Sequence, residues 1–445
     1  MIVDHRNVGA AFRRLSLPIA ISMVGDQLLG IADTIAIGTL GAAELAGATA
    51  ATSAALVLIF ALAGLWNGIA IIAAQRIGAG DVSGFARSVR AGGAVALAIG
   101  TVCALLSLPF GGPAMHAMLG GLTGSADATT YFVLRCIALI PIAITGTAVT
   151  ALGAAGHRRF AVAIMALVNL VHIPLLLILG LGWITHHPYG IAGAGVSSLI
   201  SECAAAIASI VYLARKPVYR IFERLDVDLR LAWQCLKLGA PEIVFLTLVV
   251  FPDVIIIRLL APLGAFAVAG FRAMTVVSDL TFVVPSPLQT GAQTVIGQRL
   301  GARDVEGARW FFVRARRVAF GLATAIGALF AILAWPLSWL FTLNATVASV
   351  AAGPLALQML TLPIKGWTQV SIAPIRAAGD TRFSMFVGIL SSALVIPIVW
   401  FGIEWWHLGL YAVAIGWIVA WLARLLITEL RLRGDDWATR APLST

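Results

Sequence analysis

The sequence has few charged residues for its length. Asp, Glu, Lys and Arg together make up only 11% of its 445 residues, whereas hydrophobic residues make up 60%. A soluble domain carries about 25% charged residues. The composition therefore excludes a soluble globular protein, because a fold of this length could not bury so much apolar surface.

Motifs for metal, disulfide and nucleotide chemistry are also missing. The four cysteines form no CxxC pair and lie within or beside apolar runs, so we expect no disulfide framework, no metal site and no cofactor. No GxxxxGK[ST] sequence is present, which excludes a P-loop ATPase on this chain, and neither HExxH nor GxSxG occurs. An integral-membrane enzyme that modifies lipid remains a less favoured alternative, because we find no nucleophile–base or metal constellation for it.

Long apolar runs fill most of the chain. Runs of 18 or more residues recur between Leu17 and Leu426, and each is long enough to cross a hydrocarbon core about 30 Å thick. Backbone groups in lipid must satisfy their own hydrogen bonds, so each run is expected to be helical. The sequence predicts an all-α integral membrane protein, with spans centred near residues 28, 60, 100, 141, 170, 203, 249, 283, 327, 361, 392 and 418.

Lys and Arg alternate between the loops. Arginine clusters such as Arg158–Arg159 and the run from Arg299 to Arg317 fall on one side. Short loops rich in Lys and Arg stay cytoplasmic, so both termini are expected in the cytoplasm of a bacterial-type inner membrane, which requires an even number of spans, here twelve. The net charge of +10 follows from this placement and does not indicate nucleic acid; membrane lipid is the expected neighbour. Lys and Arg are nearly absent from loops 38–48, 110–128, 182–190, 342–350 and 403–408.

The chain repeats itself at an offset of 223 residues. Laying Gly41–Gly84 on Gly264–Gly307 gives 15 identities in 44 positions without a gap, and the same offset places Pro18 on Pro241. Each half then has six helices, and both halves enter the membrane from the same side. We expect two parallel repeats (6+6) around a central cavity, with the substrate site near the midplane. The predicted parts are a lobe at 1–214, a linker at 215–230, a lobe at 231–434 and a tail at 435–445.

Several motifs resemble one transporter family. The run Leu17-Pro18, followed by Gly30-Ile31-Ala32-Asp33-Thr34, resembles the first helix of the multidrug and toxic compound extrusion (MATE) transporters. Gln75-Arg76-Ile77-Gly78-Ala79 and Leu238-Gly239-Ala240-Pro241 are similar to that family's pattern, and the resemblance covers nearly the whole chain. It implies a twelve-helix exporter that exchanges H⁺ or Na⁺ inward for an organic compound outward.

Three polar residues are candidates for ion coupling. A charge at the bilayer centre costs about 2.5–3.5 kcal/mol, so Asp33 is a functional candidate, and the resemblance places it on the aspartate that binds the coupling ion in many relatives. Asp26 lies seven residues earlier on the same face, about 10 Å away. Asn169 matches the family's asparagine in helix 5, but Ile173 stands where an acid is expected. A partnered structural carboxylate is the alternative for both aspartates.

Two further ionisable residues, His172 and Glu202, are expected to have structural roles. His172 is more typical of a packed or interfacial histidine than of a proton relay, and Glu202 of a partnered acid. One buried carboxylate with few oxygen partners favours H⁺ over Na⁺, because a metal cation needs several oxygen ligands.

The second half departs from the first. The repeat places Ile256 opposite Asp33, and Val249 and Lys365 stand where some relatives carry acids, which argues against ion coupling in this half. Lys365, the sole lysine deep within a span, either neutralises an acid or meets an anionic substrate group. The substrate-cavity candidates are the polar or aromatic residues within spans: Gln27, Asn67, Glu242, Asp253, Asp279, Lys365 and Trp367.

Together these features predict a monomeric secondary antiporter. It is expected to export small organic compounds, cationic or amphiphilic, by alternating access. A flippase for lipid-linked or amphiphilic substrates is the main alternative, which extra helices and a strongly cationic cavity would favour. A passive channel is a further alternative, and net uphill transport that an uncoupler abolishes would exclude it.

Overall fold

The computed structural model describes residues 8–40, 42–119, 125–184, 189–223, 226–249, 251–342, 345–434 and 436–439. Within these ranges the chain is helical and contains no strand. Contacts gather the chain into two compact units, which are considered separately: Leu17–Ile243, and Val244 onward together with the beginning of α1 up to Ser16.

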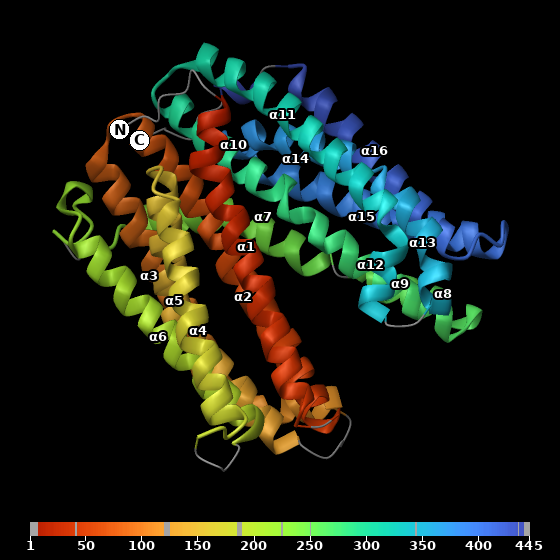
Figure 1. The fold of residues 1–445 in the computed structure, drawn as a ribbon. Helices are drawn as coiled ribbons and strands as arrows, with labels where there is room; N and C mark the ends of the chain where they lie inside the picture. The colour runs from red at the N-terminus through yellow and green to blue at the C-terminus, as the bar shows by residue number, and fades with distance from the viewer. Residues whose placement is uncertain are drawn as a thin grey trace. The chain divides into compact units, whose positions relative to one another are not determined.

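The first unit contains six long helices and the beginning of a seventh. In Figure 1, α3 to α6 run alongside one another, and contacts join α3 to α4, α4 to α6 and α5 to α6. A π-helical turn (Leu176–Gly180) continues α5, and a short 3-10 turn (Pro217–Tyr219) precedes α7. The helices are α1 (Val8–Gly38), α2 (Ala42–Gly78), α3 (Val82–Leu119), α4 (Ser125–Ala154), α5 (Arg159–Leu175), α6 (Gly190–Ala214) and α7 (Leu229–Leu248).

The second unit has more helices because several of its spans are broken. The long uninterrupted helices are α11 (Val305–Ile332), α15 (Thr381–Glu404) and α16 (Leu410–Leu432). The shorter elements are α8 (Phe251–Leu260), α9 (Ala265–Leu280), η4 (Thr281–Val283), α10 (Pro285–Gly301), α12 (Ala334–Thr342), α13 (Ala345–Met359), α14 (Leu362–Ala377) and α17 (Asp436–Thr439).

The helices account for the predicted spans. Ten segments in the described chain are long and apolar enough to cross a membrane, and the pair α13 and α14, bent by 44°, forms an eleventh. The 31-residue α1 supplies the twelfth, since at about 1.5 Å per residue it exceeds the thickness of the hydrocarbon core. The predicted all-α fold of twelve spans in two repeats is confirmed.

Two spans of the second unit are interrupted near their middles. One runs from Phe266 to Gly301 and changes from α9 through η4 to α10, where Pro285 begins the new helix. The other bends where α13 ends and α14 begins, with a proline in the first turn of α14. Proline lacks the backbone N–H of a helix interior and suits a first turn, so its place at the start of α10 and of α14 agrees with both breaks.

The repeat recurs in the loop that follows the second span of each unit. Arg76 Nη1 lies 2.8 Å from Asp81 Oδ2, and Arg299 Nη1 lies 2.6 Å from Asp304 Oδ2. Each aspartate also caps the next helix: Asp81 Oδ1 accepts a hydrogen bond from Gly84 N at 2.7 Å, and Asp304 Oδ1 accepts one from the matching glycine at 2.9 Å. The two halves therefore share atomic contacts as well as residues.

The packing of these caps changes the acidity of Asp81. Burial alone would raise the pKa of this carboxyl group. Hydrogen bonds from Gly84 N, Ser83 Oγ and Arg76, together with the Arg76 charge, outweigh burial and lower the pKa below its usual value.

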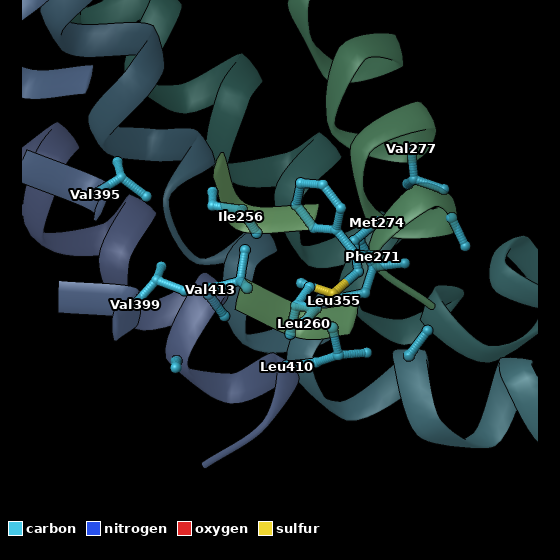
Figure 2. Close-up of a cluster of buried hydrophobic side chains, with 14 of the residues drawn as sticks. Ile256, Leu260, Phe271, Met274, Val277, Leu355, Val395, Val399, Leu410 and Val413 are labelled. Atoms are coloured by element: carbon cyan, nitrogen blue, oxygen red, sulfur yellow. The ribbon is translucent and has the colours of Figure 1, made fainter. Parts of the chain in front are cut away.

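A large apolar core lies within the second unit (Figure 2), where α8, α9, α13, α15 and α16 meet. Lipid tails are as apolar as these side chains, so van der Waals contact between closely fitted helices, rather than removal from water, holds such a core together. The residues labelled in the figure are Ile256, Leu260, Phe271, Met274, Val277, Leu355, Val395, Val399, Leu410 and Val413.

Two helices are divided between the units. Leu15, near the beginning of α1, is buried with Leu288 and Phe311 in the second unit, whereas α1 from Leu17 onward belongs to the first unit. The start of α7 packs on α2 so closely that a Cβ on Gly68 would lie 2.2 Å from the Cys235 carbonyl oxygen. The helix passes to the second unit after Ile243. The domain boundaries given above from the sequence stay a prediction.

Candidate functional site

The first unit brings an aspartate and a histidine into direct contact. Asp33 lies in α1, five residues before the helix ends, and its Oδ1 is 2.6 Å from His172 Nε2 in α5. The imidazole is buried, whereas 21% of the Asp33 side chain is accessible. With Asp33 ionised, Nε2 carries the proton and donates it to the carboxylate. Asp33 therefore has a partner, as its alternative interpretation as a partnered carboxylate requires, and His172 contacts this carboxylate directly.

The local structure of α5 explains the position of His172. Pro174 follows two residues later and removes one backbone hydrogen bond of the helix. The next residues form the π-helical turn, and Leu176 N donates to the carbonyl oxygens of His172 and Ile173. Single π-helical turns are frequent at functional sites because they change the direction of side chains within a helix.

Asn169 connects the same two helices one turn earlier. Its Nδ2 donates to Met165 O at 2.9 Å and reaches Gly25 O of α1 at 3.5 Å. Its Oδ1 is buried and accepts no hydrogen bond. A buried acceptor without a donor is costly unless it is used in another state of the protein. Because Gly25 directly precedes Asp26, the contact with Gly25 O places Asn169 next to the part of α1 that carries Asp26.

Asp26 belongs to a wider charged group in the first unit. Its side chain is accessible, and it interacts electrostatically with Glu202 of α6. Glu202 also interacts with His172 and with Arg135 of α4, whose Nη1 lies 3.4 Å from Ser198 Oγ. The interpretation of Glu202 as a partnered acid agrees with these interactions. The candidate coupling residues Asp33, Asp26 and Asn169 thus gather around α1 and α5.

The other candidates in the first unit lie on separate helices. Gln27 is exposed on α1, Asn67 is half-buried on α2, and Glu242 is half-buried on α7. Their assignment to a substrate cavity stays a prediction.

The second unit places Lys365 between the two helix breaks. Lys365 lies in the first turn of α14, is 2% exposed, and its Nζ donates to Ser278 Oγ near the end of α9 at 3.1 Å. It also interacts electrostatically with Asp279, which in turn interacts with Arg272 and Asp253. Lys365 therefore meets an acid within its own unit, as one of its two predicted roles requires.

Trp367 lies in a different polar cluster. Its Nε1 donates to Glu429 Oε1 of α16 at 2.8 Å, and Ser371 Oγ donates to the same oxygen at 2.9 Å. Arg316 of α11 completes the cluster, with Nη1 3.2 Å from Glu429 Oε2. The sequence analysis missed Glu429, although its position three residues before the end of an apolar span was a usable signal.

No group of three or more His, Cys, Asp or Glu side chains that could hold a metal occurs in the part of the chain that the structure describes. The polar groups instead form pairs and small clusters that join neighbouring helices. Polar and ionisable clusters within membrane spans are typical of proteins that bind and release solutes and ions. The fold and these clusters define the class: a polytopic membrane transporter with two six-helix repeats.

Comparison with known proteins identifies the family. The MatE family model matches residues 18–178 and again residues 241–401, two segments that start 223 residues apart, as the internal repeat predicts. The chain belongs to the MatE family, the multidrug and toxic compound extrusion transporters, whose members are transporters and not enzymes. The resemblance seen in the sequence is confirmed.

Named relatives agree with this assignment. The chain is 26% identical to a probable multidrug resistance protein NorM of Caulobacter vibrioides over 96% of its length and 92% of the relative. It is 22% identical to multidrug resistance protein MdtK of Edwardsiella ictaluri over 97% and 95% of the two chains. The chain is a multi-pass multidrug efflux transporter of this bacterial inner-membrane type.

Solved structures support the fold. A multidrug resistance MATE transporter in an outward-facing conformation matches with a TM-score of 0.89 at 21% identity, covering 98% of this chain and 99% of that one. A transporter of the MOP superfamily from Pyrococcus furiosus, described as having a binding pocket of reverse polarity, matches with a TM-score of 0.85 at 21% identity and covers 97% of both chains.

Proposed function

We propose that this transporter exports small organic compounds, cationic or amphiphilic, in exchange for H⁺, and that Asp33 and His172 form the coupling pair. The observation that carries the proposal is the 2.6 Å contact between the two side chains, which joins α1 to α5. Both groups can bind a proton, and the carboxylate stays accessible while the imidazole is buried. Asp33 is therefore the member of the pair through which a proton would enter.

The protonation states of the pair provide a switch. With one proton the pair is neutral, as a carboxylate and an imidazolium or as a carboxyl group and a neutral imidazole. A second proton makes the pair positive and removes the charge attraction, because the carboxyl group is then neutral. The contact that holds α1 against α5 weakens, so proton loading favours a different arrangement of α1.

The same charge change explains exchange. A cationic compound and a second proton both add positive charge next to Asp26, Asp33 and Glu202. Each therefore disfavours the other, and release of the compound accompanies proton binding. His172 also favours H⁺ over Na⁺, since a hard metal cation prefers oxygen ligands and an imidazolium repels it. The placement of Lys and Arg supports cytoplasmic termini.

The test is efflux of a cationic dye from proteoliposomes under an imposed pH gradient and, separately, a Na⁺ gradient. We expect the wild type to respond to the pH gradient alone. Asp33→Asn and His172→Gln should lose gradient-driven transport and still bind the dye. Glu404→Gln is the matched control, because Glu404 is exposed at the end of α15.

The opposite results are equally informative. Transport by Asp33→Asn at the wild-type rate would remove Asp33 from coupling and direct attention to Asp26 or the second unit. Transport driven by Na⁺ alone would refute proton coupling. An uncoupler should abolish net uphill transport, and its failure to do so would indicate a passive channel.

A further inference from the structure

Helix α16 carries an arginine on its interior face. Leu422, Leu426 and Leu430 are exposed and form one stripe at helical spacing. Trp421 and Thr428 are buried on the opposite face, and Arg424 lies between them, three residues after the first and four before the second. Arg424 therefore points into the helix bundle. It lies eight residues, or about 12 Å, before the end of α16, well inside the span.

This guanidinium has no counter-ion among the described residues. Its Nε is buried without a hydrogen-bond partner, and no carboxylate in the described part of the chain pairs with it. Other arginines of the unit have acids: Arg316 pairs with Glu429, and Arg431 pairs with Asp380 at 2.9 Å. A charge inside a membrane span without a counter-ion is costly, so such a group is a functional candidate.

Aromatic rings hold the guanidinium in place. Its central carbon lies 5.0 Å from the ring centroid of Trp421 and 5.5 Å from that of Phe245 in α7. Ring faces attract a cation and orient it, but they do not neutralise it. The residue keeps part of its surface accessible. A planar guanidinium fixed in this way presents a fork of N–H donors that fits two oxygens of one anionic group.

The neighbouring charges also favour an anion. Lys365 Nζ lies 5.7 Å from the centroid of the same Trp421 ring, so one indole contacts two cations. The guanidinium of Arg376 in α14 repels that of Arg424. The nearby acids are engaged elsewhere, because Asp279 interacts with Lys365 and Arg272, and Glu429 accepts three hydrogen-bond donors. An organic cation would be repelled here.

We propose that Arg424, held by Trp421 and Phe245, is a binding site for the anionic group of an amphiphilic organic anion. The ligand class is a carboxylate, sulfonate or phosphate monoester attached to an apolar body. The charged group bonds the guanidinium, and the apolar body contacts the two aromatic rings. The site lies within the second unit and is separate from the Asp33–His172 pair, so it extends the transported compounds from cations to anionic and zwitterionic amphiphiles.

The test measures binding of two probes of equal shape and opposite charge. Naphthalene-1-sulfonate and 1-naphthyl-trimethylammonium are titrated by calorimetry into the full-length protein in phosphatidylcholine nanodiscs. We expect the wild type to bind the sulfonate saturably, and Arg424→Gln to bind it about ten- to hundredfold more weakly, the usual effect of losing a charged hydrogen bond. Affinity for the ammonium probe should not fall.

Two further variants separate the site from general effects of charge and folding. Arg314→Gln is the matched control, since Arg314 also lies over an indole, 4.1 Å from the ring of Trp310, but is exposed. Its sulfonate affinity should equal that of the wild type. Arg424→Lys keeps the charge and should fold like the wild type, but without the planar fork it should bind the sulfonate several-fold more weakly.

Unchanged sulfonate affinity in Arg424→Gln, or in Arg424→Lys if the glutamine variant does not fold, would overturn the proposal. So would absence of saturable sulfonate binding by the wild type. Nanodiscs with added phosphatidylglycerol identify the source of the anion: weaker sulfonate binding there assigns the site to an anionic lipid, and unchanged binding assigns it to a soluble compound. Because binding needs no ion gradient, these results do not depend on proton coupling.

Discussion

The Asp33–His172 contact makes a quantitative prediction about stability. A hydrogen bond to a charged group contributes about 1.5–3 kcal/mol, and a partner left alone in the interior costs about 1–3 kcal/mol. We therefore compare Asp33→Leu, His172→Leu and the double variant. Each single substitution should lower the unfolding free energy by about 1–3 kcal/mol, because it leaves one polar group without its partner at a partly buried contact of 2.6 Å.

The double variant should lose much less unfolding free energy than the two single variants lose in sum. Replacing both partners by apolar groups leaves no unsatisfied group, so we expect a coupling energy of about 1 kcal/mol or more. Titration with SDS, followed by tryptophan fluorescence, gives the four unfolding free energies needed. Additive effects within about 0.5 kcal/mol would refute the contact and with it the basis for the coupling pair.

Three further predictions concern the loops and the helix packing. Asp81→Ala and Asp304→Ala should each lower the unfolding free energy by about 1–2 kcal/mol, because each removes a helix cap and an ion pair. The Asn variants should lose less stability, because an Asn side chain can still cap the helix. Unequal losses at the two sites would contradict their equivalence. The pKa of Asp81 is lower in the folded state, so the stability that Asp81 contributes is present above its unfolded pKa of about 3.9 and is lost as the pH falls below that value. The melting temperature of Asp81→Asn should therefore depend less on pH, between about pH 6 and 3, than that of the wild type. Gly68→Val should destabilise the first unit by about 1–3 kcal/mol, because the valine Cβ would collide with the Cys235 carbonyl oxygen. A melting temperature equal to that of the wild type would contradict the close packing of α2 on α7.

Several features of the fold could be predicted because they depend on averages or on local sequence. A span is recognised from the summed hydropathy of about twenty residues, so errors at single positions cancel. The Arg76–Asp81 and Arg299–Asp304 contacts join residues five apart, and the repeated sequence already contains both partners. The family match to two segments then agrees with the offset found by aligning the chain with itself.

The side-chain clusters could be predicted only in part. His172 and Asp33 are 139 residues apart, and their contact depends on the rotation of α5 about its axis. Family motifs directed attention to Ile173, whose side chain points about 100° away from that of its neighbour on a helix. Arg424 was missed for a similar reason. Its surroundings come from α7, α14 and α16, and hydropathy along α16 does not reveal which of its residues face the bundle.

Helices α1 and α7 each continue from one unit into the other. Within the described residues the chain passes from one unit to the other only after Ser16 and after Ile243, both times inside a helix. Pro18 and Pro241, which the repeat relates, lie within two residues of these points. A proline weakens a helix locally because one backbone hydrogen bond is missing. Both helices that connect the units therefore lack a backbone hydrogen bond close to the point where the chain passes from one unit to the other.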